Sequence, residues 1–167
     1  MLHQIAPEQL SGNVFEKIGK QWMLITAGTP AHCNTMTASW GGLGVLWGSP
    51  VSTIYVRPNR YTMEFLTQEK FYTLSFLPEQ YRPALNYCGS HSGRAGDKFA
   101  AAGLTKAASA CGAAYAAESE LVLVCEKAYW QDMDPTHFLL PDTDSKWYPQ
   151  HDYHRMFIGR IVEAYTR

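Results

Sequence analysis

The sequence carries little charge of either sign and has no long hydrophobic run. Its 14 lysines and arginines nearly balance 15 aspartates and glutamates, so the formal net charge is −1. This balance argues against a general electrostatic attraction to nucleic acid or to anionic membranes. No apolar stretch approaches the roughly 20 residues that a helix needs to cross a bilayer, and the first residues lack the pattern of a signal peptide. The cytoplasm is therefore the expected compartment.

The sequence also lacks any C-x-x-C pair. Its four cysteines lie far apart, a spacing that predicts free thiols and disfavours a disulfide framework or a zinc site. Neighbouring histidines and cysteines occur only in groups of two, so no metal site is predicted. The cysteines are Cys33, Cys88, Cys111 and Cys125.

What the chain does have is enough apolar material for a sizeable core. Hydrophobic residues make up 46% of the 167 residues and aromatic residues 13%, which predicts one folded domain over residues 1–167. Strand patterns alternate with short helical ones, and this order favours a mainly β, antiparallel barrel over a Rossmann sheet, which needs a long helix after nearly every strand. The predicted strands are 21–27, 34–40, 50–57, 71–77, 121–129 and 157–165.

Three short helices are predicted, at 61–69, 83–88 and 97–102. Pro83 suits a first helical position, and Gly89 is expected to end that helix. Asp97 is expected to cap the third helix, with Gly103 as its left-handed stop. The Ala-rich segment 106–117 stays open between a loop, a short helix and a partial strand.

The predicted strand at residues 34–40 places side chains of different chemistry on its two faces. Thr35, Thr37 and Ser39 share one face. A row of three hydroxyls, together with the strand backbone, suits a long flat ligand with polar edges. The alternative is a solvent-facing polar edge on an ordinary strand. The opposite face holds Asn34, Met36, Ala38 and Trp40.

Two clusters have the composition of phosphate sites. In 57–62, two arginines and a threonine stand where a strand ends and a helix begins. In 88–98, three glycines accompany serines, an arginine and a lysine. Each cluster could equally be a solvated turn or a plain loop, and neither matches the G-x-G-x-x-G or G-x-x-x-x-G-K-[ST] fingerprints.

The positions of the cations favour the functional interpretation. Six of the 14 lysines and arginines fall between positions 57 and 98, and four of those six lie inside the two clusters. Combined with a hydroxyl-bearing strand, they favour a phosphorylated, aromatic, hydrogen-bonding cofactor. Flavin mononucleotide (FMN) has that shape.

Several ordered motifs resemble the flavin reductase-like family, and most of all its flavoredoxin-like branch. The matches run from about Ile18 to Leu104, with a weaker echo in 120–129 and 154–161. The resemblance implies an FMN-binding split β-barrel, antiparallel and Greek-key, with short peripheral helices. It also implies a homodimer with the flavin near the subunit interface. The motifs are Trp22–Gly28, Asn34–Gly42, Val56–Thr62, Phe71–Phe76 and Asn86–Arg94.

The resemblance further implies which residues contact the cofactor. Segment 34–40 would meet the isoalloxazine through backbone and hydroxyl groups, and the two clusters would hold the ribityl chain and the phosphate. The predicted cofactor-binding residues are Asn34, Thr35, Met36, Thr37, Ala38, Ser39, Trp40, Arg57, Arg60, Tyr61, Thr62, Cys88, Gly89, Ser92, Gly93, Arg94 and Lys98.

The expected chemistry is electron transfer through the flavin, from NAD(P)H or a protein donor to an acceptor. Thr37 or a neighbouring backbone N–H could donate to the flavin N5, and His154 could shape the nicotinamide side or simply pack. Three readings stay open: an NAD(P)H-dependent flavin oxidoreductase, an electron carrier without a nicotinamide site, and a binding module without redox turnover. No general acid–base pair supports a hydrolase, and no nucleic-acid or membrane partner is expected.

Overall fold

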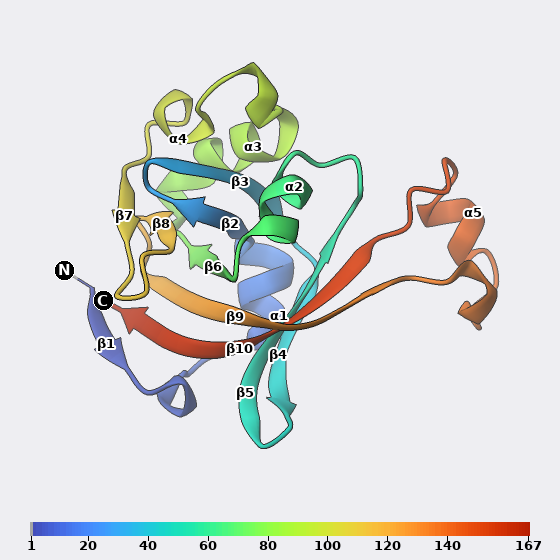
Figure 1. Ribbon diagram of the computed structural model, residues 1–167, viewed down its shortest axis with the longest axis horizontal. Helices are drawn as coiled ribbons and strands as arrows, with labels where there is room; N and C mark the ends of the chain where they lie inside the picture. The colour runs from blue at the N-terminus through green and yellow to red at the C-terminus, as the bar shows by residue number, and fades with distance from the viewer. Residues whose placement is uncertain (1) are drawn as a thin grey trace.

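The computed structural model describes residues 2–167, and its architecture is a curled antiparallel sheet with short helices around it (Figure 1). The predicted fold class, a mainly β antiparallel barrel with peripheral helices, is confirmed. Eight strands form the main sheet: β1 (His3–Ile5), β2 (Met23–Thr29), β3 (His32–Ala38), β4 (Gly41–Leu46), β5 (Ser49–Val56), β6 (Phe71–Phe76), β9 (Leu121–Asp132) and β10 (Arg155–Thr166). A separate hairpin pairs β7 (Lys106–Ala108) with β8 (Ala114–Ala116).

The helical elements are all short. They are η1 (Pro7–Gln9), α1 (Val14–Glu16), the π-helical η2 (Lys17–Gln21), α2 (Thr62–Gln68), η3 (Glu79–Tyr81), α3 (Arg82–Ser90), η4 (Gly93–Ala95), α4 (Lys98–Ala101), η5 (Pro135–His137) and α5 (Thr143–Trp147). Within residues 2–167 the structure contains no helix with the length and hydropathy needed to span a membrane.

The sheet curls because its two edge strands are consecutive in the chain. Its order is β3-β2-β6-β9-β10-β5-β4, with β1 added on β10, so β3 and β4 stand at opposite ends of the order. Only Ser39 and Trp40 separate the end of β3 from the start of β4, which forces both edges to the same place. No ladder joins β3 to β4 among the described residues, and the barrel is therefore split along this seam.

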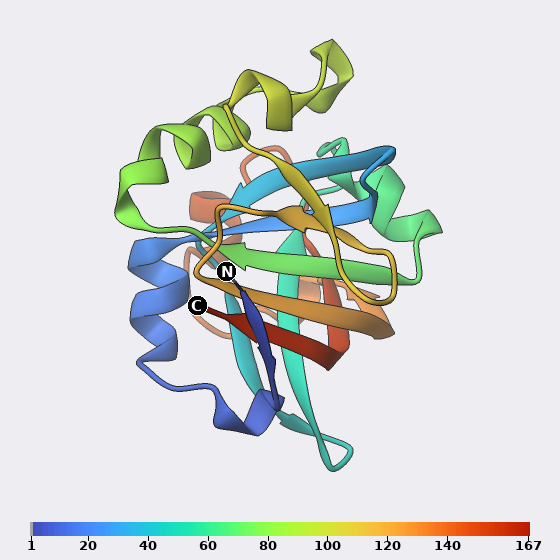
Figure 2. The same cartoon turned by 90° about the vertical axis from the view of Figure 1, so that its left-hand side faces the viewer.

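Alternation along the strands creates two apolar clusters on opposite faces of the sheet. Met23, Ile25 and Leu74 are buried inside the barrel. Leu24, between the first two, turns outward and packs with Leu85 under α3 and α4. Figure 2 shows these two helices along one side of the sheet. Full burial of each such side chain contributes about 1.5–3 kcal/mol, which holds the α3–α4 segment against the strands.

The helix caps follow the sequence except at one glycine. Asp97 accepts hydrogen bonds from the backbone N–H groups of Phe99 and Ala100, and Gly103 stops that helix with a φ of +69°. The expectation for Gly89 is wrong, because α3 continues through it to Ser90. Gly89 does not have the positive φ that a glycine helix stop needs. A Cβ there would make only an ordinary contact, 3.4 Å from the Thr37 Cβ.

Two segments differ from or refine the sequence-based expectation. Strand β4 was not predicted, since three of its six residues are glycines (Gly41, Gly42 and Gly44), and glycine weakens any strand signal. The open Ala-rich segment 106–117 contains the β7–β8 hairpin, which supports the partial-strand alternative. Gly112, with a φ of +85°, lies in its turn.

Strands β9 and β10 extend beyond the barrel and carry a lobe between them. We call residues 133–154 the lobe; it contains η5 and α5 and projects at the right of Figure 1. Within it, the rings of Phe138 and Tyr148 stack with centroids 5.7 Å apart. The lobe returns to the barrel at Asp152, which pairs with Arg57 at the end of β5. This contact brings the C-terminal third of the chain to the predicted site.

Candidate functional site

The strand at 34–40 and both predicted anion clusters converge on a single cavity of about 340 Å³. A volume of this size is within the usual range of ligand pockets. All predicted cofactor-binding residues except Thr35 and Arg94 line it, and so does His154. The lining residues are Asn34, Met36, Thr37, Ala38, Ser39, Trp40, Tyr55, Arg57, Asn59, Arg60, Tyr61, Thr62, Cys88, Gly89, Ser90, His91, Ser92, Gly93, Lys98 and His154.

The expected row of three hydroxyls does not face this cavity as a unit. Thr35 is fully buried between strands, where it accepts a hydrogen bond from Thr26 and donates to the Ile25 carbonyl. Thr37 lines the cavity, but its hydroxyl donates to the Leu85 carbonyl in α3. The hydroxyl protons of Thr35 and Thr37 are therefore already used in hydrogen bonds to the barrel and to α3. Because β3 is an edge strand, alternate backbone N–H and C=O groups point away from β2 without a strand partner.

One wall of the cavity depends on a glycine. The Asn34 side-chain amide donates to the Thr62 hydroxyl at 2.7 Å and joins β3 to the start of α2. Gly93 lies directly against this amide, and a Cβ at position 93 would be only 1.9 Å from the Asn34 Oδ1. Any side chain at 93 would push Asn34 from its place. The glycine therefore lets the loop 91–97 close on the strand.

Two cations in the cavity, Arg60 and Lys98, have no described carboxylate partner; we call them the inner cations. Lys98 is only 6% exposed, whereas Arg60 is an exposed residue at the rim. Burial lowers the pKa of the Lys98 ammonium, and the nearby Arg60 charge lowers it further. A buried, unpaired cation is costly, and a bound anion would remove that cost. This end of the cavity is suited to an anion.

The other two predicted phosphate ligands are already engaged; we call them the outer arginines. Arg57 pairs with Asp152, donates to the Trp147 carbonyl at 2.8 Å and lies over the Tyr148 ring. The guanidinium holds the pKa of the Asp152 carboxyl below its usual range. Arg57 therefore attaches the lobe to the cavity, and its charge is largely neutralised there.

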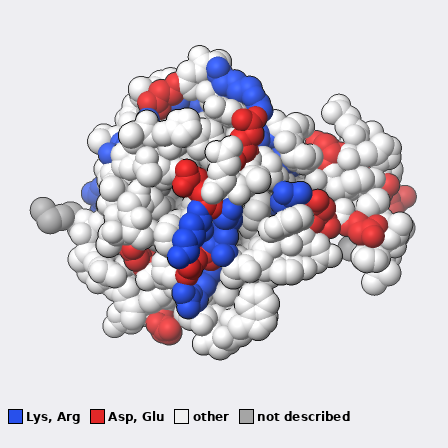
Figure 3. Space-filling view, viewed as in Figure 1, with Lys and Arg blue, Asp and Glu red and all other residues white. Residues whose placement is uncertain are grey.

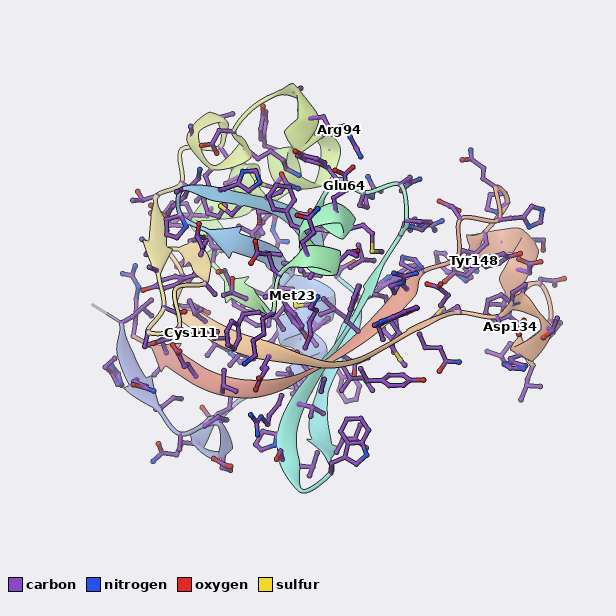
Figure 4. All side chains as sticks on the ribbon, in the orientation of Figure 1. Met23, Glu64, Arg94, Cys111, Asp134 and Tyr148 are labelled. Carbon is purple, nitrogen blue, oxygen red and sulfur yellow. The ribbon has the colours of Figure 1, made fainter. Side chains whose placement is uncertain are left out.

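Arg94 is the second outer arginine and lies outside the cavity. It pairs with Glu64 of α2, beside which it lies at the top of Figure 4, and its guanidinium is over the Tyr61 ring at 4.7 Å. Both side chains of the pair are about half exposed. Arg94 therefore supports Tyr61 from behind and does not reach the cavity directly.

His154 lines the cavity beside Trp40. Its Nδ1 is 2.8 Å from the Tyr148 hydroxyl, and its ring lies 5.3 Å from that of Trp40. The side chain is 7% exposed. Burial lowers the pKa of His154 to about 4, with the Arg57 charge acting in the same direction. The imidazole is therefore neutral near pH 7.

The only cysteine that lines the cavity is Cys88. Burial raises the pKa of its thiol to about 11, so the thiolate is scarce at neutral pH and nucleophilic catalysis is not favoured. All four cysteines are free thiols.

The predicted cofactor-binding residues omit four residues that line the cavity. Asn59, Ser90 and His91 lie inside the two clusters, and membership of a cluster was the signal that could have included them. Tyr55 carries no such signal, because it is one aromatic residue in an ordinary β5 pattern. It faces the cavity only because β5 ends beside the β3–β4 seam.

The geometry accommodates an elongated ligand with an anion at one end and a flat, polar-edged group at the other. The inner cations define the anion end. The free backbone edge of β3, with Trp40 and Tyr55 nearby, lines the other. The donor set therefore fits a phosphorylated ring system.

Comparisons with known proteins agree with this geometry. The model of the flavin reductase like domain family matches residues 15–167. No curated protein matches the chain.

Solved structures share the fold at low sequence identity. An FMN-binding domain of a flavin reductase-like enzyme from Shewanella baltica is 15% identical with a TM-score of 0.71, over 99% of this chain and 77% of that one. Flavoredoxin from Desulfovibrio vulgaris is 22% identical with a TM-score of 0.68, over 87% and 69%. An NADH:FAD oxidoreductase from Streptomyces globisporus, in complex with NAD and FAD fragments, is 19% identical with a TM-score of 0.65, over 86% and 73%.

Proposed function

The chain belongs to the flavin reductase-like domain family, and we propose that it is an FMN-binding oxidoreductase that passes electrons from NAD(P)H or a protein donor to an acceptor. The observation that carries the proposal is the pair of inner cations, because Lys98 is buried without a carboxylate partner at one end of a ligand-sized cavity. The FMN phosphate is an anion suited to that place. Bound FMN would supply the two-electron chemistry, and the protein would bind and orient it.

Each part of the cavity has a role in this proposal. Arg60 and Lys98 neutralise the phosphate, and Ser92 with the loop that Gly93 opens lies beside it. The backbone edge of β3 serves the polar rim of the isoalloxazine. For the flavin N5, a backbone N–H of β3 is a better donor than the Thr37 hydroxyl, which already donates to Leu85.

The same proposal includes association of two copies in the cytoplasm. Several large apolar side chains are exposed in the single chain, among them Phe15 (87%), Trp47 (68%) and Trp130 (56%). Exposed apolar groups of this size are typical of surfaces that associate. They support a homodimer with the flavin near the interface.

The alternative is an electron carrier that holds FMN and has no nicotinamide site. One observation favours it: the cavity has only two unpaired cations among the described residues, and the phosphate of FMN would use both. None is then left there for the pyrophosphate of NAD(P)H. A protein donor would serve such a carrier.

An anaerobic titration tests the proposal and separates its two forms. Purified protein is titrated with FMN, and binding is followed by the flavin absorbance and fluorescence. NADH or NADPH is then added under nitrogen. Bleaching identifies the oxidoreductase, and an unchanged spectrum that bleaches with dithionite identifies the carrier. A protein that does not bind FMN in the titration refutes both forms.

A further inference from the structure

A second hollow, of about 660 Å³, adjoins the cofactor cavity. We call this second hollow the apolar hollow. It shares Ser39, Trp40, Tyr55 and His154 with the cofactor cavity, so a single wall separates the two. The rest of its lining comes from the N-terminal helical segment, from β4 and from the lobe: Val14, Phe15, Ile18, Gly19, Gly41, Gly42, Leu43, Met133 and Tyr148.

The apolar hollow has no charged lining residue among those described. The cofactor cavity, by contrast, contains Arg57, Arg60 and Lys98. The surface over β4 and β5, at the bottom of Figure 3, is white, and residues 41–56 include no Asp, Glu, Lys or Arg. A ligand with a pyrophosphate or a carboxylate would find no counter-charge here. The lining selects a neutral, apolar occupant.

One side of the hollow is an unpaired strand edge made largely of glycine. Strand β4 ends the sheet order and begins with Gly41 and Gly42. A Cβ at Gly42 would meet nothing within 4 Å. Glycine in a strand often marks a place where a ligand approaches the backbone closely. Trp40 and Tyr55 also line the hollow, and together with this edge they suit a flat ring.

The hollow contains one linked polar group. The Tyr148 hydroxyl lies 2.8 Å from His154 Nδ1 and 3.3 Å from the Met133 sulfur. In one arrangement the Tyr148 hydroxyl donates to Nδ1 of His154, and the ring proton is on Nε2, which can donate to a ligand. In the other arrangement Nδ1–H donates to the Tyr148 hydroxyl, and this hydroxyl donates to the Met133 sulfur. Nε2 then has no proton and can accept a hydrogen bond from a ligand. Neutral imidazole has one donor and one acceptor nitrogen, so the pair can bond a carbonyl oxygen or an alcohol O–H.

We infer that the apolar hollow binds the electron acceptor, and that this acceptor is a neutral conjugated carbonyl compound of the quinone class. The inference rests on the proposed function. In the reaction the quinone gains two electrons and two protons, and its two C=O groups become C–OH. Reduced FMN in the cofactor cavity would supply both electrons across the shared wall of Trp40 and His154 and would itself be oxidised, and solvent would supply both protons to the quinone. A reduced nicotinamide or a protein donor would restore the reduced flavin. The His154–Tyr148 pair bonds the quinone oxygen before the reaction and the hydroxyl after it.

The test measures binding to the FMN-loaded, oxidised protein, without turnover. Duroquinone is a suitable probe, because it is neutral and its fully substituted ring resists addition of thiols. Saturation-transfer NMR on its methyl protons detects binding, and calorimetry gives the dissociation constant. Two matched variants of β4 locate the site: Gly42→Phe fills the hollow, and Gly44→Phe places the same ring on the same strand face outside it.

We expect Gly42→Phe to weaken duroquinone binding at least about tenfold, because an overfilled site excludes its ligand. Gly44→Phe should stay within about twofold of the parent. Tyr148→Phe, which keeps the ring and removes one hydrogen-bonding group, should weaken binding about threefold. FMN affinity, measured on the same samples, should change much less than duroquinone affinity in both glycine variants.

Other outcomes overturn the inference. Equal effects of Gly42→Phe and Gly44→Phe would place the probe elsewhere. Displacement of duroquinone by NADH would assign the hollow to the nicotinamide. Absence of a duroquinone signal, together with a Gly42→Phe protein that loses its dimeric state in sedimentation, would assign it to a second copy of the chain. Failure to bind FMN would instead refute the proposed function, since that measurement precedes the probe.

Discussion

The cofactor cavity and the apolar hollow share a wall and differ completely in charge. On one side of Trp40 and His154, Arg60 and Lys98 remain without carboxylates. On the other side, no described lining residue is charged and the polar group is a neutral His–Tyr pair. Of these two cations Lys98 is buried and Arg60 is exposed. An unpaired buried charge such as that of Lys98 costs free energy until its counter-ion binds, whereas an uncharged hollow carries no such cost. The difference indicates an anionic ligand on one side and a neutral one on the other.

A second contrast lies among the cations themselves. The outer arginines, Arg57 and Arg94, are satisfied by Asp152 and Glu64, and the inner cations are not. Sequence alone treats all four as equal candidates for the phosphate. Substitutions that distinguish the inner cations from the outer arginines test the assignment of the phosphate site. A change of charge at the shared wall tests the contrast between the cofactor cavity and the apolar hollow.

The largest effect is expected at Lys98. Lys98→Met should weaken FMN binding by roughly 10- to 100-fold, since a hydrogen bond to a charged group contributes about 1.5–3 kcal/mol. The FMN-free protein should become more stable by about 1 kcal/mol, because an unpaired buried charge is removed. Flavin titration and urea unfolding measure the two effects. Lys20→Met, at an exposed pair with Glu16, is the control and should change neither. A loss of both affinity and stability would show that Lys98 is structural.

The second largest effect is expected on stability at low pH, where protonation of His154 places a positive charge in the wall that borders the apolar hollow. The pKa of His154 is about 4 in the folded protein, below the usual 6.5, so the unfolded chain takes up the proton first. This contribution to stability is complete above pH 6.5 and is lost as the pH falls towards 4. We expect a loss of about 2 kcal/mol, less than the full shift implies because the ring borders an open cavity. Urea unfolding at several pH values measures it, and His154→Leu, which has no titrating group there, should lack this component.

A smaller effect on affinity is expected for Arg57. Because Asp152 and the Trp147 carbonyl already hold its guanidinium, Arg57→Ala should weaken FMN binding by less than about tenfold. The lobe should lose its attachment, and amide hydrogen exchange in residues 145–154 should accelerate. An affinity loss as large as that of Lys98→Met, with unchanged exchange, would make Arg57 a direct phosphate ligand.

The smallest effect is expected for Arg94. Its pair with Glu64 is about half exposed, and exposed pairs contribute only about 0–1 kcal/mol. Arg94→Ala should therefore change FMN affinity by no more than about twofold, through the loss of support behind Tyr61. Flavin titration of Arg94→Ala beside Arg60→Ala makes the comparison direct. A larger loss in Arg94→Ala would reverse the assignment of inner and outer.

Much of the fold could be predicted because local signals agreed with the tertiary structure. The alternation in 71–77 reports the two faces of β6, and Asp97 and Gly103 cap α4 as their chemistry requires. Strand β4 could not be predicted, because its three glycines give no alternation of apolar and polar side chains. In the structure it forms one edge of the barrel sheet. Gly89 predicts a helix end, but its backbone does not adopt the positive φ of a glycine stop, and α3 continues to Ser90.

The segments that form the site could be predicted from the sequence. Which of their cations are neutralised by carboxylates and which remain unpaired could not. Sequence shows that Arg57, Arg60, Arg94 and Lys98 lie in two clusters, but the carboxylates that neutralise two of them come from α2 and from the lobe. Asp152 is 95 positions from Arg57 along the chain. Partners so distant leave no local pattern. The strand pattern likewise predicts a ligand contact for the Thr35 hydroxyl, whereas in the folded chain this hydroxyl bonds to Thr26 on the neighbouring strand.

The seam between β3 and β4 has one more consequence. Two residues, Ser39 and Trp40, connect the facing edges, and no described ladder resists their separation. A small opening of the barrel there would move the indole, and the indole borders both the cofactor cavity and the apolar hollow. The two ligands should therefore bind with coupled affinities, each changing the clearance that the other meets, and this coupling needs no contact between them.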